Sequence, residues 1–519
     1  MQLSTQQKIV IVGGGTAGWM SAALLSRVTG GRLGQITLVE SDEIGTIGVG
    51  EATIPYIRDF NRILGLDEAE FLQATRGTIK LGIEFRDWTR LGHSYMHPFG
   101  RIGAPIGNTA FQHFLTRRRL QGGDGDFQAY SLCCMAARLN RFAPPPPADA
   151  GVHSTLGYAY HFDAGLYARH LRIYAEKLGV VRVEGRIVEV QQKPEDGHVS
   201  RLKLANGVQI EGSLFLDCSG LIGLLIEKTL NSGFEDWSHW LPCNSAAFVP
   251  SERVAPLVPY TRSTASVGGW KWRIPLQHRT GNGHVFCREF ISDESAADIL
   301  LEGLDAKALA EPRFLRFKAG RRKEFWKKNV VSIGLAAGFL EPFESTSIHL
   351  IHSGLIKLLD LWPRDDMDPL LAEQYNQAVG AEYEAIRDFL ILHYKSTERN
   401  DSAFWRYCRD NSIPDSLTYK MEHFRRSSRI ILTRGDLFQP PSWLAVFLGQ
   451  NVIPQDYDPM ADLIPEATLT AQLDGMRAEI QRKAAILPTH EEFILHAEAS
   501  RRGAWDSRFL WPRMPSDGS

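Results

Sequence analysis

One short segment near the start of the chain constrains its fold more than any other. The run Lys8–Val12 is apolar and rich in β-branched residues, as a buried parallel strand is, and Gly13-Gly14-Gly15-Thr16-Ala17-Gly18 follows directly. A GxGxxG pattern between such a strand and a helix, here Trp19–Val28, cradles a dinucleotide pyrophosphate at the helix N-terminus. We expect the first glycine to permit the tight turn, the third to admit the phosphate, and the last to let helix and strand pack closely.

A second strand and two later turns extend this pattern. The run Gln35–Val39 leads to Glu40, about 20 residues past the glycines, where a carboxylate can hold ribose hydroxyls. Later strands at Leu214–Asp217 and Val330–Ile333 each lead into a turn of small residues, which favours FAD over NAD. Many flavoprotein hydroxylases carry an aspartate where this chain has Leu335, so that position counts against a hydroxylase.

The composition narrows the class of protein. The 519 residues are 44% apolar and 23% charged, with a net charge of −2, so a nucleic-acid partner is not expected. The six cysteines form no CxxC pair and no zinc-like or disulfide-scaffold spacing, which predicts no metal site and favours the reducing cytoplasm. The polar N-terminus and the lack of a long apolar run predict neither a signal peptide nor a membrane segment.

The rest of the chain indicates an inserted sheet and a helical end. A proline-rich break at Pro144–Pro147 predicts an exposed loop, and residues 92–126 show no periodicity, which predicts a second one. Residues 268–290 predict a hairpin whose turn is Thr280-Gly281-Asn282-Gly283, because Asn-Gly supplies positive φ angles. From Pro369 onward, a helical stripe is formed by Leu371, Tyr375, Val379, Tyr383, Ile386 and Leu390.

Four separated motifs resemble the flavin-dependent tryptophan halogenase family, and the resemblance covers most of the chain. They are Gly13–Trp19, Thr78–Phe85, Trp270-Lys271-Trp272-Arg273-Ile274-Pro275, which matches the family's WxWxIP motif in full, and Glu341–Thr346.

The resemblance implies a two-domain, monooxygenase-like α/β flavoprotein with a parallel sheet, an inserted antiparallel sheet and a helical C-terminal part. We expect residues 1–365 to form the FAD-binding module, with the substrate-side sheet inserted at approximately 80–160 and 235–320. Residues 366–519 are expected to cover the substrate site. The implied cofactor contacts are Gly13, Gly15, Thr16, Ala17, Gly18, Glu40, Gly50, Ala52, Val188, Asp217, Leu335 and Ile348.

Lys80 takes a catalytic role only through this resemblance. Ile79, Leu81, Ile83 and Phe85 alternate, so strand geometry places Lys80 on the other face, where a solvent-facing lysine is the ordinary interpretation. The resemblance implies the catalytic lysine instead. Its ammonium can hydrogen-bond hypohalous acid, or a neutral amine can form a haloamine, and the sequence does not choose between the two.

Glu344 lies just before a predicted helix, and the resemblance implies roles for it and for two further sets of residues. Alone, Glu344 reads as an acid in the first helical turn that favours the helix dipole. The resemblance implies a carboxylate beside Lys80 that positions the halogen donor or accepts the ring proton. It implies a halide site at the amides of Thr346 and Ser347. Trp270, Trp272, Ile274 and Pro275 are implied to separate organic substrate from the flavin, although bulky residues on one strand face usually form core.

The implied reaction uses reduced FAD from a separate flavin reductase, together with O2 and chloride or bromide. Tryptophan-specific members grip their substrate with paired tyrosines, an acid and a Phe-Trp pair, whereas residues 435–444 here hold two prolines and no tyrosine pair. We therefore expect indole, a substituted indole or another electron-rich aromatic rather than free tryptophan. The ring contacts are expected from Phe111, His113 and Trp443.

Two alternatives remain at this point. A flavin hydroxylase would share the FAD-binding fold, and a non-catalytic flavin-binding protein would share the fold without the chemistry. A homodimer is compatible with the chain, but its sequence leaves the oligomeric state, the halide and the ring position open.

Overall fold

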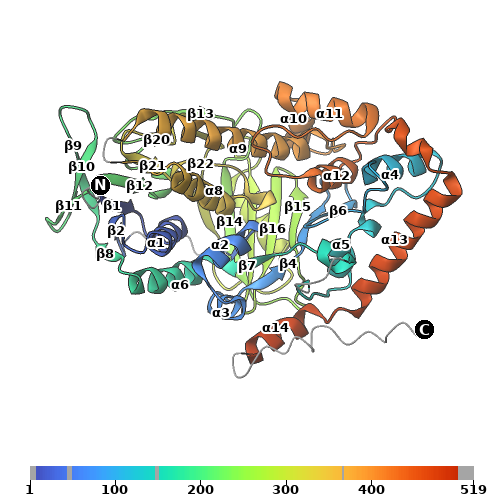
Figure 1. Cartoon of the computed structure of the whole chain (residues 1–519), viewed down its shortest axis with the longest axis horizontal. Coiled ribbons are helices and arrows are strands. Elements are labelled where there is room, and N and C mark those ends of the chain that lie inside the picture. The colour runs from blue at the N-terminus through green and yellow to red at the C-terminus, as the bar shows by residue number, and fades with distance from the viewer. Residues whose placement is uncertain (1–6, 44–49, 146–150, 365–366, 501–519) are drawn as a thin grey trace. The chain divides into compact units, whose positions relative to one another are not determined.

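The computed structural model of the chain describes residues 7–43, 50–145, 151–364 and 367–500 (Figure 1). The chain folds into two compact units, each built from three separate stretches of sequence. The first unit comprises Met1–Arg76, Phe162–Asn244 and Leu315–Glu384, and the second comprises Gly77–His161, Ser245–Phe314 and Ala385–Ser519. The last change of unit falls within a helix at residues 384–385, rather than at the expected residue 365.

A six-stranded sheet organises the first unit, in the order β20-β21-β12-β1-β2-β8. Strand β1 (Gln7–Val12) pairs in parallel with β2 (Gly34–Glu40) and with β12 (Leu214–Asp217). Val12 lies opposite both Val39 and Asp217, so the carboxyl ends of the three strands meet at one edge of the sheet. This confirms the predicted α/β class. It also brings the glycine turn, Glu40 and Asp217 to one edge, where ligands of open α/β sheets bind.

The other elements of the first unit are the outer strands of that sheet, several helices and strands of smaller sheets. Helix α1 (Thr16–Thr29) packs beside α6 (Ala164–Lys177), as Figure 1 shows. The others are β3 (Gly50–Ala52), α2 (Tyr56–Leu64), α3 (Glu68–Ala74), β8 (Val181–Glu184), the antiparallel sheet of β9 (Ile187–Gln192), β10 (Val199–Leu204) and β11 (Gln209–Glu211), then β13 (Phe234–Asp236), β19 (Gly320–Arg322), β20 (Trp326–Lys327), β21 (Val330–Ser332), β22 (Gly338–Phe339) and α8 (Ser347–Asp360).

A seven-stranded sheet organises the second unit, in the order β18-β14-β17-β16-β15-β5-β6. Its strands are β5 (Gly82–Arg86), β6 (Ser94–Pro98), β14 (Ser245–Ser251), β15 (Thr261–Ser266), β16 (Gly269–Pro275), β17 (Thr280–Phe286) and β18 (Arg313–Arg316). The other elements are β4 (Thr78–Lys80), α4 (Phe111–Leu120), α5 (Leu132–Arg138), β7 (Ala159–Asp163), α7 (Asp293–Glu302), α10 (Ala403–Asp410), α11 (Asp415–Ser427), α12 (Pro440–Gly449), α13 (Glu466–Ile486) and α14 (His490–Ser500).

The predicted hairpin exists, but its turn was misplaced. β16 and β17 pair antiparallel from Gly269↔Phe286 to Pro275↔Thr280, so the connection is residues 276–279. The segment Thr280–Gly283 lies inside β17. Gly283 stands there because a Cβ would come 2.0 Å from the indole of Trp272, its cross-strand partner. The prediction of a loop over residues 92–126 was also wrong, because β6 and α4 form there.

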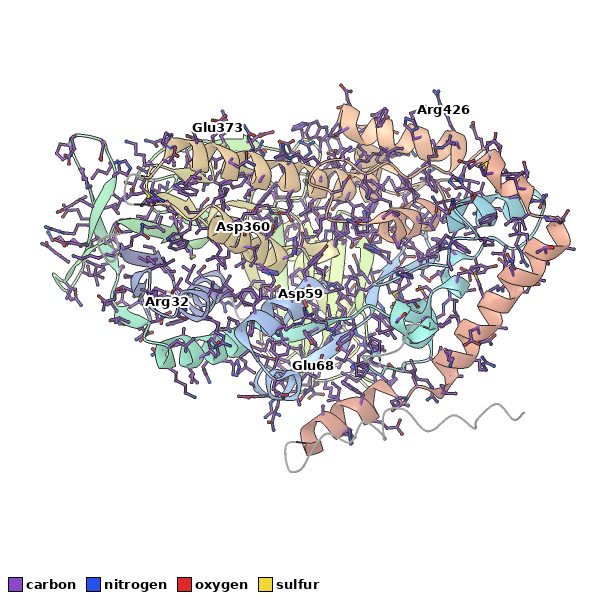
Figure 2. The ribbon with its side chains drawn as sticks, viewed as in Figure 1. Arg32, Asp59, Glu68, Asp360, Glu373 and Arg426 are labelled. Atoms are coloured by element: carbon purple, nitrogen blue, oxygen red, sulfur yellow. The ribbon has the colours of Figure 1, made fainter. Side chains whose placement is uncertain are left out.

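The helical stripe after Pro369 is confirmed as one helix, α9 (Pro369–Lys395). Five of its six predicted apolar residues are buried, and Leu371 is half-buried. In the part of the chain that the structure describes, no helix has both the length and the apolar character needed to cross a membrane. Exposed charges of both signs are distributed over the chain, as Figure 2 shows for Arg32 in the turn after α1 and for Asp360, Glu373 and Arg426 on helices. Pro146 and Pro147 of the proline-rich break lie outside the described residues.

Candidate active site

The glycine turn after β1 has the geometry that a bound dinucleotide needs. Gly13 has a φ of 110°, and a Cβ there would lie 2.4 Å from the carbonyl oxygen of Cys218 at the end of β12. A Cβ at Gly18 would lie 1.8 Å from the Gly13 carbonyl oxygen, so this glycine lets α1 approach the turn. Gly15, by contrast, faces open space, and no side chain caps the first turn of α1. The uncapped amides and the open side of Gly15 fit a pyrophosphate.

Glu40 lies against this turn. A Cβ at Gly14 would come within 1.4 Å of its Oε2, so the carboxylate occupies the space beside the glycine backbone. Its Oε1 accepts a hydrogen bond from Arg182 and lies 3.6 Å from Nη1 of Arg172. Two arginines therefore hold the carboxylate at the turn, where the ribose of a dinucleotide would lie. These residues fit an adenine dinucleotide.

Asp217 holds the loop that follows β12, and its expected contact with the cofactor stays a prediction. Its Oδ1 accepts hydrogen bonds from the amide and the hydroxyl of Ser219, at 3.1 and 2.6 Å. Its Oδ2 accepts from the amides of Leu225 and Ile226, both at 2.8 Å. Both oxygens of this fully buried carboxylate therefore hold the loop after β12, against which the Gly13 turn packs.

Lys80 ends a short strand in the second unit and is fully buried. The expected single strand over residues 78–85 is interrupted at Leu81, whose amide donates to Pro259 and whose carbonyl accepts from Phe99. The Lys80 ammonium lies 5.0 Å from the centre of the Phe99 ring, which is within cation–π range. The solvent-facing interpretation of Lys80 is therefore wrong. A buried ammonium next to an aromatic face is suited to binding a second aromatic ring.

Buried polar side chains hold the strand that carries Lys80. The Thr78 hydroxyl donates to the carbonyl of Pro275 at 2.7 Å, so it accepts from Nδ1 of His161 at 2.9 Å. Nε2 of His161 lies 2.9 Å from the hydroxyl of Thr261. Burial, together with the charge of Lys80, lowers the pKa of His161 well below its ordinary value, so this imidazole is neutral. The last residue of the tryptophan motif thereby contacts the strand of the lysine.

Glu344 is fully buried in a single 3-10 turn, Pro342–Glu344, in the first unit. Ser345 follows with a φ of 61°, and α8 begins at Ser347. Glu344 therefore precedes the helix, and our placement of it in the first helical turn was wrong. Thr346 occupies the N-cap position, but its side chain makes no capping bond, and the first turn of α8 contains no acidic residue. The amides at this helix start can receive an anion.

An ion-pair network fixes α8 to α9 within the first unit. Glu382 on α9 lies 2.8 Å from Nε2 of His349 and 2.7 Å from Nζ of Lys357, and it accepts from the hydroxyl of Ser353. Burial alone would raise the pKa of Glu382, but His349 and Lys357 outweigh it and bring the pKa to about 2. The start of α8 is therefore supported by a permanently charged carboxylate.

Comparison with known proteins identifies the family. The tryptophan halogenase family matches residues 8–466. Tryptophan 6-halogenase SttH from Streptomyces toxytricini is 34% identical over 518 residues, which cover 95% of this chain and 99% of that protein. The chain belongs to the tryptophan halogenase family. Lys80, Glu344 and the glycine turn all lie within the matched residues, and the alternative of a non-catalytic protein is not supported.

Two solved structures of flavin-dependent halogenases have the same fold. BrvH from Brevundimonas sp. BAL3 has a TM-score of 0.92 and 42% identity, and the match covers 95% of this chain and 99% of that one. Xcc4156 from Xanthomonas campestris has a TM-score of 0.91 and 47% identity, over 97% and 99% of the two chains. A flavin hydroxylase is thereby disfavoured.

The WxWxIP motif of this family member forms the middle of β16. Trp270 and Ile274 are buried on one face, and Trp272 between them packs over Gly283. Trp270 and Trp272 contact each other with ring centres 6.1 Å apart. Trp270 also contacts Trp88, so these side chains contribute to the core of the second unit. A separating role toward the flavin stays a prediction.

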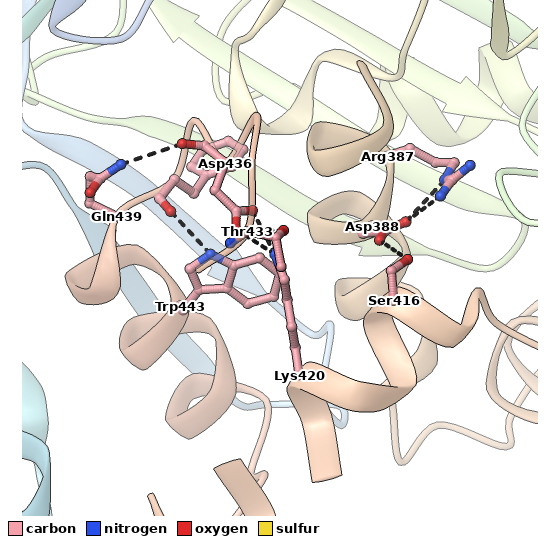
Figure 3. A network of polar contacts seen from close by, with 9 residues as sticks. Arg387, Asp388, Ser416, Lys420, Thr433, Asp436, Gln439 and Trp443 are labelled. Carbon is pink, nitrogen blue, oxygen red and sulfur yellow. Dashed lines mark hydrogen bonds and ion pairs between the residues drawn. The ribbon is translucent and has the colours of Figure 1, made fainter. Parts of the chain in front are cut away.

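Residues 435–444, whose sequence led us to expect a substrate other than free tryptophan, are held by polar contacts with neighbouring residues (Figure 3). Nζ of Lys420 lies 2.6 Å from both oxygens of Asp436, and both side chains are almost completely buried. Asp436 also accepts from Thr433, and the Trp443 indole donates to the Phe438 carbonyl at 3.0 Å. The Lys420 ammonium lies 4.6 Å from the Trp443 ring. The polar groups of this segment are therefore engaged internally.

The remaining predicted residues differ in their surroundings, and their roles stay predictions. Phe111 is buried against the Tyr130 ring, with centres 4.8 Å apart, and Nδ1 of His113 accepts from the Asp458 amide. Val188 is 52% exposed on β9. Ala52 is buried and Gly50 begins β3. Leu335 is half-buried, and Ile348 is buried at the start of α8.

Sequence reasoning missed three residues near Lys80. Phe99 contacts the ammonium, His161 bonds to Thr78, and His490 accepts from the Ile79 amide. Phe99 follows β6, in the segment that we predicted to be a loop. A buried histidine carries no signal of its role in a single sequence, because its partners are set by tertiary contacts.

Proposed function

We propose that the protein halogenates free indole, a substituted indole or a related electron-rich aromatic, using chloride or bromide. The observation that carries this proposal is the buried Lys80 ammonium against the Phe99 ring, in a member of a halogenase family. An aromatic substrate that packs on Phe99 would present a ring carbon to the ammonium. The fixed geometry of a β-strand then selects the carbon that reacts.

The oxidant is proposed to form at the flavin site and to be used at Lys80. The chemistry that reduced FAD supplies, when delivered by a separate flavin reductase, is the O2-dependent oxidation of halide to hypohalous acid, with water as the other product. The start of α8, at Thr346 and Ser347, would hold the halide through its free amides.

At Lys80, the hypohalous acid transfers its halogen to a ring carbon. When Lys80 is an ammonium, the carbon–halogen bond forms as the halogen–oxygen bond breaks, and Lys80 gives a proton to the departing oxygen, which leaves as water. When Lys80 is a neutral amine, it first takes the halogen as a haloamine and releases water, and the carbon–halogen bond then forms as the nitrogen–halogen bond breaks. In both routes Glu344 accepts the proton that the ring carbon loses, and this proton restores the starting protonation state of Lys80. Both routes convert one aromatic C–H and one hypohalous acid into one C–halogen and one water.

We infer the class of substrate from residues 435–444, which include Asp436. A free amino acid brings an ammonium and a carboxylate, which need charged partners when they are buried. Asp436 is the single acid between residues 435 and 444, and Lys420 and Thr433 already engage it. The segment thus offers no charge to a zwitterion, and an indole needs none.

The test is a parallel assay of indole and tryptophan with FAD, a flavin reductase, NADH, air and bromide or chloride, read by mass spectrometry. We expect halogenated indole, and a kcat/KM for tryptophan lower by about tenfold or more, since an unpaired buried charge costs at least that much. Lys80→Met should abolish the product, whereas Lys307→Met, at an exposed lysine of the same unit, should not. A preference for tryptophan would refute the substrate class, and product from Lys80→Met would refute the role of the lysine.

A further inference from the structure

The strand that carries Lys80 has one unusual edge. β4 is an edge strand that pairs antiparallel with β7, from Thr78↔His161 to Lys80↔Ala159. Successive residues of a strand direct their backbone groups to opposite sides, so the Ile79 amide points away from β7. No strand among the described residues receives it. Nε2 of His490 accepts its hydrogen bond instead, at 3.1 Å, and both residues are fully buried.

The protonation state of His490 suits this bond. Its Nδ1 lies 3.0 Å from the Leu257 carbonyl oxygen, which can only accept, so the proton is on Nδ1 and Nε2 keeps a lone pair. Burial lowers the pKa of His490 to about 4, although the Leu257 carbonyl acts in the opposite direction, and Arg253 lowers it further. At neutral pH the imidazole is therefore an acceptor.

His490 is itself held in place by backbone bonds. It begins α14, and its own amide donates to the Asn140 carbonyl at 2.9 Å. Two residues earlier, the Pro488 carbonyl accepts from the Phe142 amide at 3.0 Å. Because the imidazole is fixed by these bonds and by Leu257, it can fix the Ile79 peptide in turn.

We propose that His490 is a positioning residue for Lys80. By holding the amide of the preceding residue, it sets the direction in which the lysine side chain leaves β4. This inference rests on the proposed function, in which Lys80 directs the halogen of hypohalous acid to a ring carbon. Thr78 is held by Pro275 and His161, so the two residues before Lys80 are both anchored by groups that are neutral at pH 7.

We expect loss of the bond to His490 to leave the formation of hypohalous acid unchanged but to reduce the transfer of its halogen to the substrate. In His490→Ala, the Ile79 amide should lose its protection from hydrogen exchange, measured by mass spectrometry of the peptides spanning residues 78–81. The kcat for halogenated indole should fall on the order of ten- to hundredfold, as expected when a reacting group is misplaced by about 1 Å. Oxygen consumption and KM for indole should stay unchanged, and more hypohalous acid should be trapped by a scavenger such as taurine.

Two further variants separate positioning from general folding. His490→Gln keeps a carbonyl for Ile79 and an N–H for Leu257, so it should restore most of the kcat and the amide protection. Glu492→Gln weakens the contact of Glu492 with the Thr489 amide at the start of α14, without touching β4, and should behave as the wild type. Where His490→Ala does not fold, His490→Asn, whose amide is too short to reach both partners, takes its place.

The inference is overturned if His490→Ala keeps the wild-type kcat, if the Ile79 amide stays protected in it, or if the glutamine variant is no better than the alanine variant. A general loss of oxygen consumption in His490→Ala would also overturn it. A wild-type enzyme that halogenates no aromatic compound would instead refute the proposed function. The Ile79 exchange comparison would still report on the bond to His490 in that case.

Discussion

An alanine at position 14 would place its Cβ 1.4 Å from Oε2 of Glu40. The carboxylate would have to leave the turn and its two arginines, so we expect Gly14→Ala to weaken FAD binding by about tenfold or more, the value of one charge-assisted hydrogen bond. Titration of flavin fluorescence measures this. Gly475→Ala is the control, because nothing lies within 4 Å of the added methyl group there. Equal affinity of Gly14→Ala and wild type would show that Glu40 does not contribute to binding.

Among individual residues, those that could be predicted act together with residues that are close to them in the sequence. Gly13, Gly18 and Glu40 follow from strand, turn and helix within one segment. The structure shows a tight turn at Gly13 and a close backbone approach at Gly18, whereas the ribose contact of Glu40 stays a prediction. The burial of Lys80 could not be derived in this way, because alternation shows which residues share a face and not what covers it. His490 is 411 residues from Ile79, and no spacing rule relates the two.

At the scale of elements, the α8–α9 network gives a prediction about stability. Glu382→Gln removes the charge that pairs with His349 and Lys357 while the side chains remain buried or half-buried. We expect a loss of about 3 kcal/mol in unfolding free energy, as for other broken buried ion pairs. Urea denaturation measures it. Glu373→Gln, at an exposed position of the same helix, is the control and should change the unfolding free energy little.

The hairpin of β16 and β17 shows why element boundaries were harder to predict than element types. Asn282-Gly283 is the strongest local signal for a turn, yet Gly283 is small because the indole of Trp272 lies across it. The need for a residue without a side chain at position 283 therefore comes from the partner strand β16 and not from a turn. The connection at residues 276–279 instead closes with the Leu276 amide donating to the Arg279 carbonyl. Long periodic elements such as α9 were predictable because their own side chains carry the signal.

For the whole molecule, buried histidines predict sensitivity to mild acid. Burial lowers the pKa values of His284, His352 and His490 to about 4 from an ordinary 6.5. As the pH falls, these histidines therefore bind protons in the unfolded chain before they do so in the folded protein. Their contribution to the unfolding free energy is complete above pH 6.5 and is lost as the pH falls toward 4, by up to about 3 kcal/mol per histidine. Glu51, whose pKa burial raises to about 7, acts in the opposite direction over this range but offsets only one of the three.

Urea unfolding at pH 7, 5.5 and 4.5 measures this loss. His284→Asn keeps a donor for the Ala296 carbonyl and removes the titrating ring, so its unfolding free energy should depend less steeply on pH than that of the wild type. An unfolding free energy that rises or stays level from pH 7 to 4.5 would contradict the prediction.

The distance in sequence between Ile79 and His490 also affects how the protein is made. A ribosome completes β4 early, but 411 further residues must be added before the acceptor for its edge amide emerges. Until then the strand presents an open backbone donor, which exposed edge strands use to associate with other chains. The lysine that we propose to be catalytic is thus among the first functional groups to be synthesised, while its local structure is among the last to be completed.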